Sequence, residues 1–344
     1  MVQLLPARWA CAVALSVGAL AATGAAAAPP AAPPRFVFSA YKYSPLGMQP
    51  GSATMREADG GDLLASLSAA SDGGPAPVLT WSFATGECGA ETWADRPGQA
   101  IADANLPAFQ RAGIGYIIST GGQGGVFTCG SDAGMERFIA RYLSPQLIGL
   151  DFDIEAGQSP AAITALAQRL AVVRQSHPQL RLSFTLATFA ASDGSQASLN
   201  ATGVQVLAAL RSAGVDGFVI NLMVMDFGKA ESANCVVRAG RCDMAASARQ
   251  AAQNASVKYQ LPLTQIELTP MIGMNDVVDN VYTADDALAT ARYVREQHLA
   301  GLHYWSFDRD RPCPVPQAAA SDLCHGAPGP ARYGYYRAFA AGLR

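Results

Sequence analysis

Past about residue 35, the chain alternates between short apolar runs and longer amphipathic segments. The apolar runs are rich in β-branched and aromatic residues, which predicts β-strands. The segments between them carry apolar residues three and four positions apart, which predicts α-helices that pack on a sheet. The predicted strands cover residues 36–41, 77–83, 115–119, 147–157, 180–187, 217–226, 264–272 and 301–307. The predicted helices cover 62–70, 101–112, 134–143, 160–177, 204–213, 245–259, 285–297 and 333–343, and a cysteine-bearing loop over 229–244 precedes the sixth.

Strand and helix therefore alternate eight times, with no linker between two halves of the chain. This pattern predicts one α/β domain, a (β/α)8 TIM barrel with a parallel sheet. Because the active site of such a barrel is built at the carboxyl ends of its strands, chemically unusual residues at those ends are the candidates for function.

The fourth predicted strand carries three acids in alternation with apolar residues, and 147–157 reads Leu-Ile-Gly-Leu-Asp-Phe-Asp-Ile-Glu-Ala-Gly. Successive side chains of a strand leave opposite faces, so Asp151, Asp153 and Glu155 share one face. Three acids on one buried face are costly unless the site needs carboxyl groups with different pKa values, as acid–base chemistry does. A metal site or a solvated edge strand would carry the same pattern.

Other predicted strands also end in unusual residues. The third ends in Ser-Thr-Gly-Gly over 119–122, where glycines allow a tight turn beside a site. The remaining candidates lie on the sixth and eighth strands or just after the seventh, and are Asn221, Met223, Asp226, Asn275 and Trp305. A flat indole suits the apolar face of a sugar ring. For the earlier tryptophans, Trp81 and Trp93, we expect a role in packing. Asp308, Arg309 and Asp310 are expected to fix loops through ion pairs.

Composition limits the class of partner. The formal net charge is −3 and no basic run occurs, so we expect neither nucleic acid nor an anionic surface as a partner, and a neutral substrate is favoured. Hydrophobic residues make up 50% of the chain and charged residues only 15%, which suits a large globular core. Past the N-terminal segment no apolar run is long enough to cross a bilayer.

The N-terminal segment is predicted to direct export. Arg8 is followed by an apolar stretch and by the small residues Ala25, Ala26 and Ala27, which is typical of a secretory signal peptide over 1–28. An Ala/Pro spacer is predicted over 29–35 and the catalytic barrel over 36–344. The mature protein is therefore expected to be extracellular or periplasmic and free of a membrane.

Six cysteines remain after removal of the signal, and an even number in an exported chain suggests three disulfides. Six cysteines allow fifteen connectivities. We favour Cys235–Cys242 and Cys313–Cys324 as local staples, which leaves Cys88–Cys129 to join the loops after two neighbouring strands. A zinc site is the rival, but no histidine lies at ligand spacing from any pair, so no metal is expected.

The acidic strand resembles the catalytic strand of the chitinase-like glycoside hydrolase family 18, whose pattern is Asp-Gly-x-Asp-x-Asp-x-Glu. Gly149 and the three acids match it, and Ile148 replaces its first Asp. Ser-x-Gly-Gly over 119–122 and the strand-eight Trp305 also resemble that family. Met223 and Asp226 match the family's strand-six Met-x-Tyr-Asp, but Met225 stands in place of the tyrosine, as in a bacterial branch with Asn-x-Met-x-Met-Asp.

The resemblance implies a mechanism in which the 2-acetamido group of the substrate sugar attacks its own anomeric carbon. Glu155 would be the general acid and then the base, Asp153 would hold the acetamide N–H, and Asp151 would tune Asp153 from beneath. The other residues assigned to substrate binding are Asp226, Trp305, Met223, Gly122, Asn221 and Asn275. No metal or organic cofactor is implied, because the substrate supplies the nucleophile.

Three functions fit these residues. The leading one is a secreted chitinase acting on chitin or N-acetylglucosamine oligosaccharides, expected to be a monomer. An endo-β-N-acetylglucosaminidase that acts on N-glycan cores would use the same mechanism. A non-catalytic chitin-binding lectin would need a defect, for which Met225 is the visible candidate.

Overall fold

The computed structural model of the protein describes residues 1–3, 35–72 and 78–344. The chain divides into two units, Met1–Ala31 and Ala32–Arg344, and every element given below lies in the second. Apart from residues 1–3 and residue 35, the predicted signal peptide and spacer lie outside the described residues.

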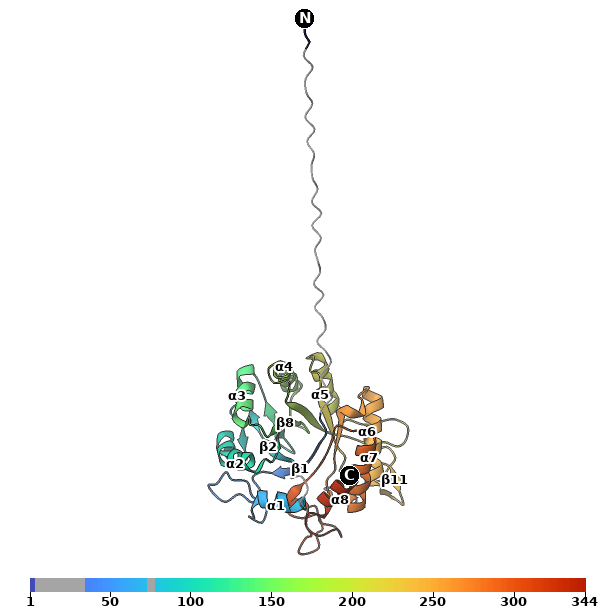
Figure 1. Ribbon diagram of the computed structural model, residues 1–344. Coiled ribbons are helices and arrows are strands. Elements are labelled where there is room, and N and C mark those ends of the chain that lie inside the picture. The colour runs from blue at the N-terminus through green and yellow to red at the C-terminus, as the bar shows by residue number, and fades with distance from the viewer. Residues whose placement is uncertain (4–34, 73–77) are drawn as a thin grey trace. The chain divides into compact units, whose positions relative to one another are not determined.

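Eight parallel strands close into a barrel, which confirms the predicted fold (Figure 1). Each strand pairs with the strands before and after it in the chain, and the last pairs with the first. In chain order the barrel strands are β1 (Val37–Tyr43), β2 (Val78–Ala84), β6 (Tyr116–Gly121), β8 (Leu147–Asp153), β9 (Arg181–Ala187), β10 (Val219–Met223), β13 (Ile266–Thr269) and β16 (Gly301–Tyr304).

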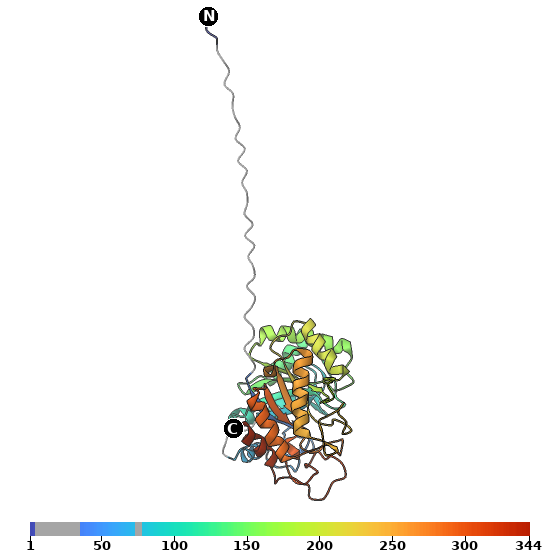
Figure 2. The same ribbon diagram turned by 90° about the vertical axis from the view of Figure 1, so that its right-hand side faces the viewer.

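One long helix follows each barrel strand, and these helices surround the strands (Figure 1). They are α1 (Leu63–Ala70), α2 (Gly98–Ala112), α3 (Asp132–Tyr142), α4 (Pro160–Ser176), α5 (Ala201–Ser212), α6 (Met244–Tyr259), α7 (Ala284–Glu296) and α8 (Gly334–Leu343). The side that holds α6, α7 and α8 faces the viewer in Figure 2. No helix among the described residues is long and apolar enough to cross a bilayer.

Local chemistry sets the ends of these helices. The Ser159 side chain accepts a hydrogen bond from the Ala162 N–H, and Pro160 takes the first helical position of α4, as the sequence predicts. Helix α7 begins with a capping box formed by Thr283 and Asp286. Both devices satisfy N–H groups that the first turn of a helix leaves without partners.

The apolar core lies between strands and helices, where Phe152 of β8 stacks on Phe184 of β9 with ring centroids 5.3 Å apart. Trp81 is fully buried and contacts Phe109 of α2, and Trp93 is also fully buried, which confirms their predicted packing role. A dense apolar layer of this kind supplies most of the free energy of folding.

Inside the barrel, by contrast, polar side chains dominate. Glu267 is fully buried, pairs with Arg181 and accepts a hydrogen bond from His303 Nε2 at 2.9 Å. His303 Nδ1 lies 2.5 Å from Ser39 Oγ. These groups form a hydrogen-bonded layer toward the amino-terminal ends of the strands, below the site described next.

Short strands and turns extend the loops above the barrel. They are β3 (Gly86–Glu87), β4 (Thr92–Trp93), β5 (Arg96–Pro97), β7 (Phe127–Thr128), β11 (Val237–Arg238), β12 (Arg241–Cys242), β14 (Gly273–Met274) and β15 (Val281–Tyr282), with the 3-10 turn η2 (Phe307–Arg309), whereas the 3-10 turn η1 (Leu263–Gln265) directly precedes β13. Several predicted strands ran too far into these loops. The sixth ends at Met223 and the seventh at Thr269, because the chain then leaves the ladder to build the site.

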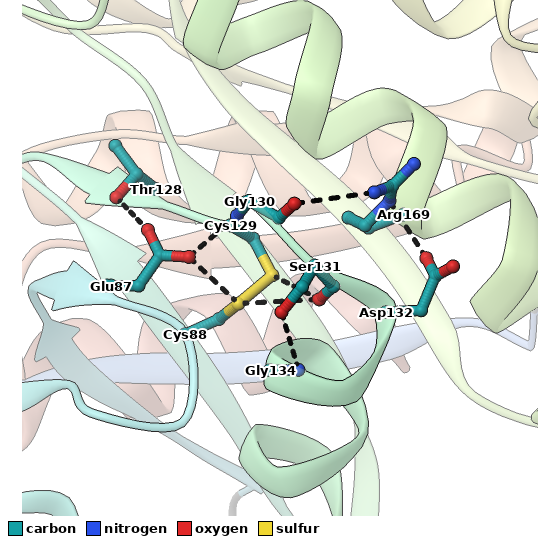
Figure 3. The surroundings of a disulfide bond; sticks show 9 residues. All are labelled: Glu87, Cys88, Thr128, Cys129, Gly130, Ser131, Asp132, Gly134 and Arg169. Carbon is teal, nitrogen blue, oxygen red and sulfur yellow. Dashed lines mark hydrogen bonds and ion pairs between the residues drawn. A yellow bond between two sulfur atoms is a disulfide. The ribbon is translucent and has the colours of Figure 1, made fainter.

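All three predicted disulfides form: Cys88–Cys129, Cys235–Cys242 and Cys313–Cys324. The first joins the loops that follow β2 and β6, and Figure 3 shows its surroundings. Glu87 accepts hydrogen bonds there from Thr128 Oγ1 and the Gly130 N–H, so the two loops are also joined beside the sulfurs. Because Cys88 and Cys129 are bonded to each other, they offer no thiolate to a metal ion.

Candidate active site

A cavity of about 280 Å³ opens at the carboxyl ends of the barrel strands. Five carboxyl groups and three aromatic rings line it, and no Lys, Arg or His does so among the described residues. The lining residues are Tyr41, Phe83, Gln123, Asp153, Glu155, Thr185, Met223, Met225, Asp226, Thr269, Met271, Asp276, Trp305, Ala320 and Asp322. Two of the three predicted acids, Asp153 and Glu155, thus meet residues from every part of the barrel rim.

Asp151 lies beneath the cavity and is held by four hydroxyl groups. Its Oδ2 accepts hydrogen bonds from Tyr41 Oη at 2.9 Å and Ser119 Oγ at 2.6 Å. Its Oδ1 accepts from Ser183 Oγ at 2.7 Å and Thr185 Oγ1 at 2.8 Å. Burial raises the pKa of Asp151, and these four donors oppose the rise by stabilising the carboxylate.

Asp153, at the end of β8, is 5% exposed and faces the cavity. Burial raises its pKa well above the usual range, and the negative charges of Glu155 and Asp151 raise it further. Its Oδ1 has no hydrogen-bond partner among the described residues. A buried acceptor without a donor is costly, so this oxygen suits a donor supplied by a ligand.

Glu155 lies just beyond the end of β8 and is partly exposed in the cavity. Burial raises its pKa, and the carboxyl groups of Asp226 and Asp276 add to that rise. A carboxyl group whose pKa is raised keeps its proton at a higher pH and can act as a general acid. Its environment therefore differs from that of Asp151, four residues earlier, whose hydroxyl donors favour the charged form.

Asp226 reaches the cavity from the loop after β10. Its backbone has a φ of 48°, in the left-handed region that few residues other than glycine adopt. Its Oδ1 accepts a hydrogen bond from the Val277 N–H at 2.8 Å. Burial raises the pKa of Asp226, and the Val277 N–H acts against that rise.

Aromatic rings form one wall of the cavity. Trp305 stacks on Phe83 with centroids 5.7 Å apart and planes inclined by 16°, and the Tyr41 ring lies 6.2 Å from that of Trp305. A wall of this kind offers a flat apolar surface beside the acids. Met223 and Met225 also line the cavity, so the residue in place of the expected tyrosine faces the site.

Three residues predicted to bind substrate do not line the cavity, so the structure does not place them as direct contacts there. Asn221 is fully buried and donates to Tyr41 Oη and Thr185 Oγ1 below the site. Asn275 is also fully buried, with its side chain bonded to backbone groups.

Gly122 is the third such residue, and it has a steric role. It has a φ of +79°, and a Cβ atom there would lie 2.5 Å from the Phe83 ring. Its neighbour Gly121 is equally constrained, since a Cβ atom there would lie 2.1 Å from the Asp153 carbonyl oxygen. The glycines therefore let the β6 loop approach both Phe83 and the acidic strand.

Sequence reasoning missed several residues that line the cavity. Tyr41 and Phe83 lie near the carboxyl ends of β1 and β2, and this shared position was the available signal. Asp276 directly follows the predicted Asn275, whereas Asp322 lies in a loop with no pattern of its own.

The predicted loop-fixing trio after β16 is confirmed in part. Asp308 forms a buried ion pair with Lys42 at 2.7 Å. Arg309 instead donates to backbone carbonyl groups, among them Ile272 O at 2.9 Å, and Asp310 accepts from the Tyr335 and Tyr336 N–H groups. All three side chains fix loops, but only one does so through an ion pair.

Comparison with known proteins finds sequence similarity to chitinases. No protein-family model matches it. Over 219 residues, 60% of this chain, it is 26% identical to a probable bifunctional chitinase/lysozyme of Escherichia coli strain K12 and 26% identical to endochitinase 11 of Metarhizium anisopliae. The match spans 24% of the length of the first protein and 42% of the second.

Solved structures share the barrel. The catalytic domain of a hyperthermophilic chitinase from Pyrococcus furiosus matches with a TM-score of 0.67 and 22% identity, over 90% of this chain and 95% of that one. A catalytic-site mutant of the thermostable chitinase from that organism, complexed with chito-oligosaccharides, matches over the same shares with a TM-score of 0.64. These structural likenesses show the fold, and the sequence likenesses confirm the predicted relationship.

Proposed function

We propose that this chain, a chitinase-like member of glycoside hydrolase family 18, hydrolyses β-1,4 bonds between N-acetylglucosamine units. The observation that carries the proposal is Asp153, which lines the cavity and whose buried Oδ1 has no partner among the described residues. The N–H of a 2-acetamido group is a donor of the right kind for it. Glu155 and the Trp305 ring line the same cavity and would lie beside that sugar.

In the first step, the acetamide carbonyl oxygen attacks the anomeric carbon while Glu155 gives its proton to the glycosidic oxygen. The bond between the anomeric carbon and that oxygen breaks, and an oxazolinium ion forms. Asp153 accepts the hydrogen bond of the acetamide N–H and stabilises the positive charge that develops on the ring. The raised pKa of Glu155 supports its role as the acid.

In the second step, a water molecule attacks the anomeric carbon from the face that the leaving group vacated. The Glu155 carboxylate takes the proton of that water, and the bond to the acetamide oxygen breaks. Two inversions at one carbon give net retention, as for the substrate-assisted glycosidases. The four hydroxyl donors to Asp151 stabilise negative charge on it beneath Asp153, and such charge would favour the cationic intermediate.

We also propose that the protein is secreted after removal of a signal peptide over 1–28. The three disulfides support this placement, because such bonds persist in oxidising compartments and are rare in the cytosol.

The test is hydrolysis of a chitooligosaccharide by the wild type, Glu155→Gln and the matched control Glu231→Gln, which changes an exposed glutamate. We expect NMR to show the β-anomer as the first product of the wild type and of the control. Loss of the general acid should lower kcat by about 10²–10⁴-fold.

Two outcomes would overturn the assignment. Binding of the oligosaccharide without cleavage would indicate a lectin, in which Met225 has replaced a needed contact. Neither binding nor cleavage, with cleavage of a high-mannose N-glycan core, would indicate an endo-β-N-acetylglucosaminidase.

A further inference from the structure

Asn275 is a fully buried side chain that joins two of the loops around the cavity. Its Oδ1 accepts a hydrogen bond from the Asp226 backbone N–H at 3.2 Å, in the loop after β10. Its Nδ2 donates to Met271 O at 2.8 Å and to Gly273 O at 3.2 Å, both in the loop after β13. The Asn275 side-chain amide therefore connects Asp226 to the loop after β13.

The bonding capacity of this amide is largely used. Both Nδ2 hydrogens have acceptors and Oδ1 has a donor, so a substrate could reach Asn275 only after these bonds break. In agreement with these hydrogen bonds, Asn275 does not line the cavity. Its contribution to a reaction must therefore pass through Asp226.

Asp226 needs such support, because its φ of 48° is disfavoured for a residue with a Cβ atom. The loop after β13 supplies two bonds to it. Asn275 Oδ1 holds its backbone N–H, and the Val277 N–H holds its carboxyl oxygen Oδ1 at 2.8 Å. Backbone and carboxyl are thus fixed from the same loop, and the carboxyl stays at the cavity beside Glu155.

We propose that Asn275 is a positioning residue, which holds Asp226 in its left-handed conformation and so keeps the Asp226 carboxyl in the catalytic cavity. The inference rests on the proposed function only for its kinetic consequence. Its structural part, the conformation of residue 226, is independent of the substrate.

The charged groups that face Glu155 define how this would appear in a pH profile. These groups are the carboxyls of Asp153, Asp226, Asp276 and Asp322, and the Arg309 guanidinium interacts electrostatically with the last three. Asp226 raises the pKa of Glu155, so its displacement should lower that pKa. The alkaline limb of kcat/KM should then move to lower pH.

Asn280 offers a matched control. It is buried, and its Nδ2 donates to Gly228 O at 3.1 Å, so it joins the same two loops without contacting Asp226. Asn280→Ala and Asn275→Ala each remove one buried amide. We therefore expect both variants to lose stability, but only the second to move Asp226.

The test combines kinetics with a crystal structure of Asn275→Ala. We expect kcat to fall about tenfold to a hundredfold, as for a displacement of about 1 Å at a reacting group, with a smaller change in KM. The kcat of Asn280→Ala should stay within about twofold of the wild-type value. In an Asp226→Ala background, Asn275→Ala should lower kcat by less than about twofold, because two changes that act through one group are not additive.

The crystal structure tests the positioning role of Asn275 even if the wild type cleaves no chitooligosaccharide. That result would contradict only the proposed function. A variant structure in which residue 226 leaves the left-handed region supports the positioning role. An unmoved Asp226 overturns it. So does a loss of activity that persists at full size in the Asp226→Ala background.

Discussion

The hydroxyl group of Tyr41 donates a hydrogen bond to Asp151 Oδ2 over 2.9 Å, across the barrel interior from β1 to β8. The Tyr41 hydroxyl also lies 2.9 Å from Thr185 Oγ1, which itself donates to Asp151. The first strand of the barrel therefore takes part in holding the charge of the acid beneath the site.

Tyr41→Phe removes this donor and leaves three hydroxyl groups on Asp151. A hydrogen bond to a charged group contributes about 1.5–3 kcal/mol, so we expect kcat on a chitooligosaccharide to fall roughly tenfold or more. The control is Tyr43→Phe, which makes the same change at an exposed position of β1. Equal activities of the two variants would show that the bond to Asp151 is dispensable.

Asp153→Asn should stabilise the protein at neutral pH. The pKa of Asp153 is raised in the folded state by burial, Glu155 and Asp151, so the folded protein holds a proton that the unfolded chain has released. Stability therefore falls as pH rises from about 4, the unfolded value, through the folded pKa. Replacing this carboxyl by an uncharged amide, which needs no proton uptake on folding, should raise Tm at pH 7 by about 2 °C or more.

The gain should disappear near pH 3.5, where Asp153 is protonated in both states. Differential scanning calorimetry at both pH values would measure it, with Asp279→Asn as the exposed control. A lower Tm of Asp153→Asn at pH 7 would mean that the carboxylate is stabilised rather than penalised by its surroundings.

Glu267→Gln should destabilise the protein at neutral pH, in contrast to Asp153→Asn. Burial acts to raise the pKa of Glu267, but Arg181 and His303 prevail and lower it to about 2. Its stabilising contribution is present above about pH 4.3, the unfolded value, and is lost as pH falls toward 2. The variant leaves Arg181 buried without its partner, which costs about 3–5 kcal/mol at pH 7. Urea unfolding should show that the difference in unfolding free energy between wild type and variant becomes smaller below pH 4. A difference under about 1 kcal/mol at pH 7 would contradict the prediction.

Opening two of the disulfides should separate stability from function. Cys313–Cys324 closes the loop that carries Ala320 and Asp322, both in the lining of the cavity, whereas the 229–244 loop with Cys235–Cys242 supplies no lining residue. The cysteine-to-serine pair at either bridge should cost about 2–3 kcal/mol. Only the 313/324 pair should also raise KM for an oligosaccharide. Equal KM values would assign the 313–324 bridge a purely structural role.

Much of the architecture could be predicted from local sequence patterns. Alternating runs of period two and period 3.6 were enough to predict the eight strand–helix pairs, and Ser159 with Pro160 predicted the start of α4, because these signals depend only on neighbouring residues. The order of Asp151, Asp153 and Glu155 placed three acids on one face for the same reason. Short sequence separations likewise favoured two of the three disulfides.

The tertiary structure alone decided which residues meet. Tyr41 reaches Asp151 only because the barrel closes, and Phe83 reaches Trp305 only because the loop at Gly122 has no side chain in the way. Asn275 looked like a ligand from its place after a strand, yet the fold turns it inward to hold Asp226. Sequence determines the period of a strand and the order of its side chains. Contacts between distant strands, and the direction of a loop side chain, depend on register, closure and packing, which no local pattern contains.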